Sequence, residues 1–265
     1  MVEHQGIHPE VGGSNPTPPL QNSELYLEFC SRSDSRYKVI RDRHYVANKG
    51  AHAQQIHFLI HYKGEVVGII SGGAAAYTTA PRDEFFKITK DNRQEVLNGI
   101  VDNTVFRLEL HEKNLATRVL SIWQKVSCVI WEDLYGVVVY GFETFVVEEI
   151  RGKSTLGDRT GALYRADNWT FTGITAGNAK NHDGVGLTGG LEGGKGSFSR
   201  KAVVPKLVYC KWRSGFSEPV RVKYKSSWRA QTKAEKEHAK LLGRKRKDYL
   251  GKLFLCRGKN VVKIG

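Results

Sequence analysis

The alternation of apolar and polar positions near the middle of the chain predicts a strand that leads into one long helix. Over residues 104–110 apolar and charged side chains alternate, which is typical of a strand and puts Arg107 and Glu109 on one face. Apolar side chains then recur every three or four positions, which predicts an amphipathic helix. Asn114 is placed to begin this helix and Gly136 to end it.

The junction of this strand and helix has the features of an anion site. The first amides of a helix have no intrahelical partner, and the helix dipole is positive at that end. Arg107 and Glu109 lie just before it. A simple pairing of Arg107 with Glu109 explains the same two charges without a ligand, so both interpretations stay open.

The flanking segments predict a chain that mixes strands and helices. A hairpin is expected at Gln55–Tyr62 and Glu65–Ser71, because Lys63 and Gly64 form a turn between two apolar runs. The other expected elements, in chain order, are a helix at 24–30, an edge strand at 36–46, a loop at 81–90, a helix capped by Asp91, a strand at 137–147, a short helix at 162–169, strands at 170–174 and 203–212, and a helix at 232–242.

Net charge is distributed unevenly along the 265 residues. The whole chain carries +14 at pH 7, yet residues 221–265 alone hold 15 Lys and Arg against 3 Asp and Glu. The first 220 residues hold 26 basic and 24 acidic side chains, a balance of only +2. A basic segment on a nearly neutral body predicts a polyanionic partner, most simply nucleic acid.

These features divide the chain into three parts. We expect a flexible, proline-containing lead at 1–24, a folded domain at 25–220 and a basic extension at 221–265. A glycine-rich loop at 177–199 interrupts the domain. It contains the spacing G-x-x-x-x-G-K, but Gly196 stands where a phosphate-binding loop has Ser or Thr, so we expect a lid or a nucleic-acid contact instead.

Cysteine spacing and the lack of long apolar runs bear on location. No apolar run reaches the length of a membrane span, and the first residues do not read as a signal peptide. We therefore expect a cytoplasmic protein that does not enter the membrane. Four widely separated cysteines fit no disulfide framework and no zinc spacing, which indicates a reducing compartment: Cys30, Cys128, Cys210 and Cys256.

Glu143 is the one charged residue in the predicted strand at 137–147. A carboxylate in a buried strand is costly unless it is paired or functional. It is therefore a candidate general base with a raised pKa, or else the buried partner of a cation such as Arg107.

Histidines gather near the predicted hairpin and suggest a metal ion. His52, His57 and His61 lie close together in sequence, with His44 just upstream. No Asp or Glu joins them at ligand spacing, so hydrogen-bonded strand histidines are the alternative. The sequence leaves the metal open.

The order of the expected elements resembles the GCN5-related acyltransferase family. The resemblance rests on a hairpin, a helix, a charged strand, a long helix, another strand and then an A-L-Y helix. It implies an α+β fold, in which a mixed sheet is flanked by helices. The basic extension is expected, from its own residues, to follow as a helix. In that family the strand before the long helix and the helix's first turn hold the donor pyrophosphate, and the A-L-Y tyrosine, here Tyr164, serves the leaving group. The family's glycine-rich turn is replaced here by HEKNLAT at 111–117.

Several separated blocks carry a closer resemblance over roughly residues 36–175. They read GAHAQQIHFLIHYKGEVVGIISGG, RDEFFKITKDNRQ, DNTVFRLE, KNLATRVLS, YGFETFV and GALYRADNW. These blocks resemble the Mom DNA-modification proteins of phage Mu and its relatives. More distantly, the ETFV strand and the YRAxNW segment resemble the DruA anti-phage proteins.

The resemblance implies a transferase that hypermodifies DNA. Mom-type proteins place a carbamoylmethyl group on the exocyclic amine of adenine in duplex DNA, which protects phage DNA from host restriction. Matching positions imply these catalytic residues: Arg107, Glu109, Ser121, Glu143 and Tyr164. We expect substrate contacts from Asn103, Asn114, Asp167, Asn168 and Trp169, and from the basic tetrad Arg244, Lys245, Arg246 and Lys247.

These residue types suit the implied chemistry. The adenine amine is a poor nucleophile, so a carboxylate must take its proton, with Glu143 as first choice and Glu109 as second. Arg107 could hold an anionic donor or a developing oxyanion, and Tyr164 could protonate the leaving group. The adenine must leave the base stack, with Trp169 or Tyr164 as a stacking platform. Packing roles for both aromatic residues are the alternative.

The donor and the partners are less determined. Glycyl-tRNA is one candidate donor, because its ester has no pyrophosphate that would need the missing turn, and acyl-coenzyme A is the other. Expected partners are duplex DNA and, with the first donor, tRNA. The oligomeric state is open, and a homodimer is one option. Alternative functions are an acyl-coenzyme A-dependent N-acyltransferase acting on another amine, and a non-catalytic DNA-binding protein.

Overall fold

The computed structural model describes residues 25–44, 54–147, 160–175, 205–221 and 233–264. The predicted lead at 1–24, the glycine-rich loop and His52 lie outside these ranges, so the expectations for them stay predictions.

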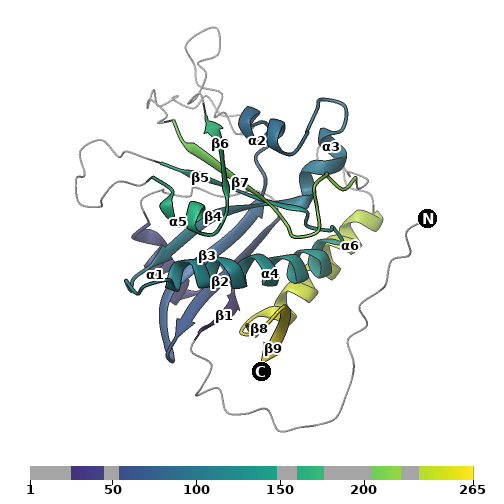
Figure 1. Ribbon diagram of the computed structural model, residues 1–265. Helices are drawn as coiled ribbons and strands as arrows, with labels where there is room; N and C mark the ends of the chain where they lie inside the picture. The colour runs from purple at the N-terminus through teal and green to yellow at the C-terminus, as the bar shows by residue number, and fades with distance from the viewer. Residues whose placement is uncertain (1–24, 45–53, 148–159, 176–204, 222–232, 265) are drawn as a thin grey trace, which may run out of the picture.

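A mixed sheet of nine strands forms the centre of the described structure (Figure 1). Its order is β6-β7-β5-β4-β3-β2-β1-β8-β9, and only β4 and β5 pair in parallel. The strands are β1 Leu25–Cys30, β2 Gln55–Tyr62, β3 Glu65–Ala74, β4 Ile100–Leu108, β5 Gly141–Val146, β6 Thr170–Ile174, β7 Leu207–Trp212, β8 Leu253–Arg257 and β9 Asn260–Ile264. The predicted α+β class, a mixed sheet flanked by helices, is confirmed.

Helices cover both faces of this sheet. The helices are α1 Ser35–Asp42, α2 Ala80–Phe85, α3 Arg93–Val96, α4 Leu115–Tyr135, α5 Ala162–Ala166 and α6 Lys233–Tyr249, with a 3-10 turn at Leu97–Gly99. The main core lies between the sheet and α4, where Trp123 and Trp131 are fully buried. On the opposite face α2 and α3 cover a second core with Phe86, and α1 covers a third.

The long helix forms where the apolar period predicts it. It ends at Gly136, whose φ of 65° is left-handed and whose N–H donates to the carbonyl of Glu132. Asn114 occupies the position before the helix, but its side chain makes no capping hydrogen bond. Val129, at the edge of the predicted stripe, is 48% exposed.

Two predictions for the first described segment are wrong. Residues 24–30 were expected to be a helix, but Leu25–Cys30 is strand β1, paired with β2 and β8. Residues 36–46 were expected to be a strand, but Ser35–Asp42 is helix α1, capped by the Asp34 carboxylate, which accepts from the amide of Arg36. β1 is set by its neighbours in the sheet rather than by local propensity, whereas α1 begins at a local cap.

The segment at 81–90 also differs from its prediction. It was expected to be a loop, but helix α2 begins at Ala80 with Pro81 in its first turn, a position that proline favours. Asp91 was expected to cap the next helix, but Asn92 holds that position.

The β4–β5 pair is short and ends at a defined point. Its last rung joins Asp102 to Glu143. One residue further along β4 the pairing with β3 shifts, so that Thr104 is an extra residue between Asn103 and Val105, a β-bulge. Beyond this rung no residues of β4 and β5 are paired, and side chains occupy the space between the two strands.

The basic C-terminal segment is built into the sheet. Helix α6 runs beyond the predicted 232–242 through the whole basic tetrad to Tyr249. The hairpin β8–β9 follows and extends the sheet, with Phe254 of β8 opposite Leu27 of β1 and buried in the main core. Within the ranges that the structure covers, no helix has the length and apolar character of a membrane span.

Candidate functional site

Two carboxylates face the same side of the sheet at the last β4–β5 rung. Glu143 is fully buried, its Oε2 accepts from Nη1 of Arg82 at 2.8 Å, and its Oε1 accepts from the amide of Ala76 at 3.0 Å. Asp102 lies opposite Glu143 in the ladder and is partly exposed as a residue. Its Oδ1 is buried and has no hydrogen-bond partner among the described residues.

Helix α2 supplies the cation of this cluster. Arg82 is fully buried, and besides Glu143 it donates from Nε to Asp83 at 2.7 Å and from Nη2 to the carbonyl of Ala76 at 2.5 Å. Asp83 in turn pairs with Arg93 at 2.8 Å. The guanidinium is therefore fixed by three acceptors, and only one of them is Glu143.

The two carboxyl groups hold protons more tightly than usual. Burial raises the pKa of Glu143 to about 7, and this effect is larger than the opposite effect of the Arg82 charge. Burial, and next the charge of Glu143, raise the pKa of Asp102 well above its usual range. Near neutral pH the pair therefore carries less than two negative charges and can exchange a proton.

A second polar group lies on the opposite face of the same two strands. Tyr164 of α5 donates from its hydroxyl to Oδ1 of Asn103 at 2.8 Å, and Nδ2 of Asn103 donates to the carbonyl of Ser71 at 3.1 Å. Thr144 donates to the carbonyl of Asn103 at 3.1 Å. The Tyr164 ring is buried and stacks on Tyr209 with ring centres 5.9 Å apart. These side chains bridge β4 and β5 just beyond their last rung.

Asp167 connects this face to the core. Its Oδ2 accepts from Trp169 at 2.9 Å, from Lys211 at 2.9 Å and from Gln124 at 2.5 Å. Trp169 is buried against Tyr164, which is the packing role left open from the sequence. A stacking role for Trp169 stays a prediction, as do the substrate contacts of Asp167 and of Asn168, whose φ of 59° is left-handed.

The structure brings only some of the predicted catalytic residues together. Glu143 points from β5 to the side of the sheet that α2 covers, whereas Tyr164 of α5 packs in the main core on the α4 side. The two sides meet where the β4–β5 pairing ends. Ser121 is exposed on α4, and no described contact joins it to Glu143 or Tyr164.

Arg107 and Glu109 form the simple pair that the sequence left open. The Nε of Arg107 donates to Glu109 at 2.5 Å, and its Nη1 donates to the carbonyl of Arg43 at 2.8 Å. Near the start of α4, the Glu112 carboxylate accepts from Tyr62 and lies 3.8 Å from Nζ of Lys63. In the described structure, Arg107 and the first amides of α4 therefore do not form the anion site that the sequence suggested.

The described histidines have protein partners of their own. Nδ1 of His57 lies 3.0 Å from the Ser71 hydroxyl, and burial lowers its pKa to about 3, so this side chain is neutral. Nε2 of His61 lies 2.8 Å from Glu28. In the part of the chain that the structure covers, no three His, Cys, Asp or Glu side chains gather as metal ligands. These residues therefore do not fit the suggested metal ion.

The basic tetrad splits into two halves on α6. Lys245 pairs with Asp133 at 3.2 Å, and Arg246 donates to the carbonyl of Gln55 at 2.5 Å. Arg244 and Lys247 are exposed. Of the four, Arg244 and Lys247 are therefore the ones that can contact a polyanion without breaking a described interaction.

Sequence reasoning missed two residues of the carboxylate cluster. Asp102 lies between Val101 and Asn103 in an apolar strand, so the argument that selected Glu143 could have found it as well. Arg82 stood in a segment expected to be a loop, and nothing in its sequence surroundings indicates a buried cation.

A family model described as Druantia protein DruA matches residues 22–235 of this chain. The match covers β1 to β7 and reaches into the start of α6. The comparison with curated proteins gives no match.

Solved acetyltransferase structures match the fold at low identity. The Salmonella typhimurium enzyme that modifies the N-terminal serine of ribosomal protein L7/L12 is 10% identical, with 72% of this chain and 96% of that chain covered and a TM-score of 0.39. The microcin C7 self-immunity acetyltransferase MccE is 13% identical, with 60% and 61% covered and a TM-score of 0.31. Mycobacterium smegmatis RimJ is 12% identical, with 63% and 56% covered and a TM-score of 0.33. The match thus spans less than two thirds of the last two proteins.

Proposed function

The chain belongs to the family of the Druantia protein DruA, and we propose that it is a transferase that modifies the exocyclic amine of adenine in DNA. The observation that carries this proposal is the carboxyl pair Asp102–Glu143, buried at the last β4–β5 rung with raised pKa values. A pair that exchanges a proton near neutral pH is suited to an acceptor amine that must lose one.

The proposed reaction uses both faces at the end of this ladder. The adenine amine attacks the carbonyl carbon of the donor, a C–N bond forms, and the amine proton passes to the carboxyl pair. Asp102 is assigned the first proton transfer, because its buried Oδ1 has no hydrogen-bond partner among the described residues. Glu143, held by Arg82, receives or shares the proton. The bond from that carbon to the leaving oxygen or sulfur breaks, and Tyr164 gives the leaving group its proton.

Asn103 sets the orientation of Tyr164 in this scheme. Because Nδ2 of Asn103 is fixed by the carbonyl of Ser71, its Oδ1 must face the tyrosine hydroxyl. Without a donor bound, the Tyr164 proton is held by Asn103. A leaving group that takes this proton has to replace Asn103 as acceptor.

The charge distribution supports a DNA substrate. The net charge of +14 is concentrated in the C-terminal segment, and Arg244 and Lys247 present it on the exposed side of α6. The target amine lies inside the base stack of a duplex, so the adenine must be flipped out to reach the carboxyl pair.

The transferred group follows from the resemblance to Mom-type proteins, and the candidate donors follow from the chemistry of that group. The implied product carries a carbamoylmethyl group. After an activated glycine is joined to the exocyclic nitrogen, its own amine attacks the ring carbon, and the bond from that carbon to the original exocyclic nitrogen breaks. That nitrogen takes up the proton that the attacking amine loses and becomes the amide of the carbamoylmethyl group. Glycyl-tRNA and acyl-coenzyme A are the candidate donors. The Glu112 carboxylate near the start of α4 disfavours a pyrophosphate there, which supports the tRNA ester.

Mass spectrometry of nucleosides tests the acceptor. DNA from cells that express the chain should contain adenine with the added mass of a carbamoylmethyl group, and Glu143→Gln should abolish it. Glu237→Gln is the matched control, because this carboxylate is exposed on α6 and should leave modification unchanged. Unmodified nucleosides from cells with soluble, folded protein would refute the proposal.

A purified reaction tests the donor. Duplex DNA, tRNA, glycyl-tRNA synthetase and isotopically heavy glycine should yield labelled adenine. If ribonuclease treatment leaves the label unchanged, the tRNA donor is wrong. If modified adenine forms when acetyl-coenzyme A is the only donor, the acyl-coenzyme A alternative is supported.

A further inference from the structure

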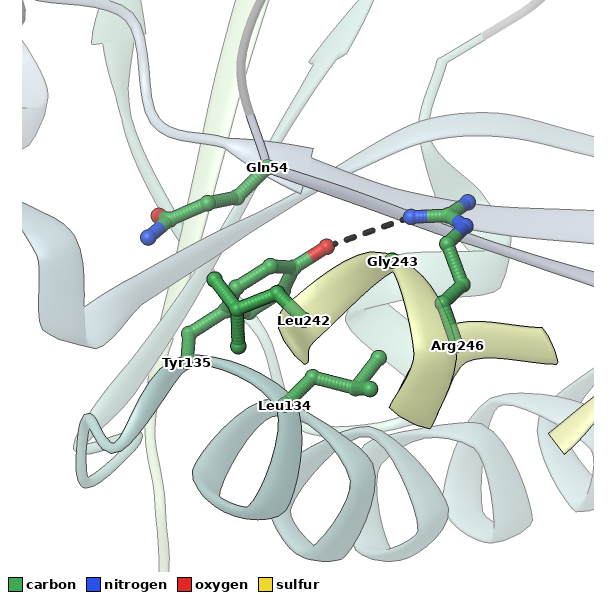
Figure 2. A pocket seen from close by; sticks show the side chains of 6 residues that line it. All are labelled: Gln54, Leu134, Tyr135, Leu242, Gly243 and Arg246. Atoms are coloured by element: carbon green, nitrogen blue, oxygen red, sulfur yellow. Dashed lines mark hydrogen bonds between the residues drawn. The ribbon is translucent and has the colours of Figure 1, made fainter. Parts of the chain in front are cut away.

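A cavity of about 390 Å³ lies between the end of α4, the start of β2 and the middle of α6 (Figure 2). It is separate from the carboxyl pair, since none of its lining residues belongs to β4, β5 or α2. Its lining residues are Gln54, Leu134, Tyr135, Leu242, Gly243 and Arg246.

Gly243 is unexpected where it stands. It lies in the interior of the 17-residue helix α6, where glycine is less stable than alanine by about 1 kcal/mol. Its φ is not in the left-handed region, and an added Cβ would meet no atom within 4 Å. Neither a turn nor a close approach requires glycine here. Gly243 lines the cavity and is exposed, so a larger side chain at this position has open space to enter.

The walls of the cavity suit a flat ring. Leu134 and Leu242 provide apolar surface from two helices, and the Tyr135 hydroxyl is joined to Arg246 by the hydrogen bond drawn in Figure 2. The Tyr135 ring is held in place, because its hydroxyl donates to the carbonyl of Gln55 at 2.9 Å and accepts from the amide of Gln55 at 3.1 Å. Gln54 adds an amide that can both donate and accept a hydrogen bond.

The charge of the cavity is positive and lacks a carboxylate. Nη1 of Arg246 donates to the carbonyl of Gln55 at 2.5 Å and to the Tyr135 hydroxyl at 3.3 Å. In the described ranges no carboxylate pairs with Arg246, and no Asp or Glu lines the cavity. Exposed Arg244 and Lys247 extend the positive charge along the same helix. The cavity therefore complements an anion attached to a flat ring.

We propose that this cavity binds one nucleotide unit, with the base against Leu134, Leu242 and Tyr135 and the phosphate on Arg246. The volume is in the usual range of small-molecule sites, about 300–1,000 Å³. Stacking of a base on an aromatic side chain beside a cation is the common mode of contact with unpaired nucleic acid. The nucleotide comes either from a bound strand or from the free pool, and both present the same chemistry. This binding does not depend on the carboxyl pair.

Filling the cavity from α6 gives a direct test. Gly243→Leu puts a side chain into the open space, and Gly243→Ala is the matched control that adds a single methyl group. Both replace a helical glycine, so both should keep or raise the melting temperature. Full-length proteins are titrated with adenosine monophosphate by calorimetry and with a single strand containing 2-aminopurine by fluorescence.

The proposal expects wild type and Gly243→Ala to bind similarly and Gly243→Leu to bind at least about tenfold more weakly, a difference of about 1.4 kcal/mol. Glu143→Gln should bind like wild type, which separates this site from the transferase chemistry. If Gly243→Leu loses binding of both the mononucleotide and the single strand, the natural ligand is a nucleotide within a strand. If it loses binding of the mononucleotide alone, the natural ligand is a free nucleotide. Unchanged binding of both ligands by Gly243→Leu, or no binding of either by wild type, overturns the proposal.

Discussion

The difference in stability between wild type and Glu143→Gln should change with pH. Two effects oppose each other at this carboxyl group: burial favours the protonated form, and the charge of Arg82 favours the ionised form. Burial is the larger effect and raises the pKa from the usual 4.5 to about 7. The folded state then keeps a proton that the unfolded chain loses between these two values. The contribution of Glu143 to stability is therefore fully present below about pH 4.5 and is lost as the pH rises through about 7.

The size of the effect follows from this shift. One pKa unit corresponds to about 1.4 kcal/mol, so wild type should lose about 2.5 kcal/mol at this group between pH 5 and pH 8. Glutamine is neutral at every pH and mimics the protonated acid. At pH 5 the two proteins should therefore agree within about 1 kcal/mol. At pH 8 the variant should have gained about 2.5 kcal/mol relative to wild type.

Urea unfolding at both pH values measures this difference, because titrating groups away from Glu143 largely cancel between the two proteins. Asp102 does not cancel, because the charge of Glu143 raises its pKa, so the measured difference belongs to the carboxyl pair. Glu237→Gln is the control, since its carboxylate is exposed and its difference from wild type should not change with pH. If wild type instead gains stability relative to Glu143→Gln as the pH rises, the ion pair with Arg82 outweighs burial. Glu143 would then be a permanent anion, and its proposed role in proton transfer would be wrong.

Three further perturbations test other parts of the structure. Tyr164→Phe should lower DNA modification about 100- to 10,000-fold in a nucleoside assay while DNA affinity stays unchanged, and near-normal modification would exclude the hydroxyl as the acid. Arg244→Glu combined with Lys247→Glu should reduce the slope of log affinity against log salt by about 1.8, because two phosphate contacts are lost; an unchanged slope would place the DNA elsewhere. Phe254→Ala should lower the free energy of unfolding by about 3–5 kcal/mol in urea titrations, since this ring is buried in the main core, and a loss below 1 kcal/mol would contradict the docking of β8.

The integration of the C-terminal segment changes how its charge should be tested. Deleting residues 225–265 would remove β8 and β9 and expose the edge of β1, so lost DNA binding could reflect misfolding. Charge reversal at Arg244 and Lys247 avoids this, because both side chains are exposed. The basic composition was visible in the sequence, but its place beside β1 was not.

The sequence alone determined the elements whose signal is local. The long helix at 115–135, the hairpin predicted at 55–71 and the strand at 170–174 follow from apolar periods and turn residues that lie within the elements themselves. Glu143 was recognised as a buried carboxylate for the same reason, because its apolar neighbours are adjacent in sequence.

Only the tertiary structure decided the rest, because it depends on contacts between distant residues. Leu25–Cys30 is a strand because β2 and β8 pair with it, although its own residues permit a helix. Arg82, and not Arg107, is the partner of Glu143, since the fold packs α2 against β6 and β7 and Arg82 reaches Glu143 on the neighbouring strand β5. The bulge at Thr104 and the single parallel pairing of β4 with β5 set which side chains share a face. The pairing places Asp102 beside Glu143, while the packing of α5 in the main core puts Tyr164 on the other side, which no local period encodes.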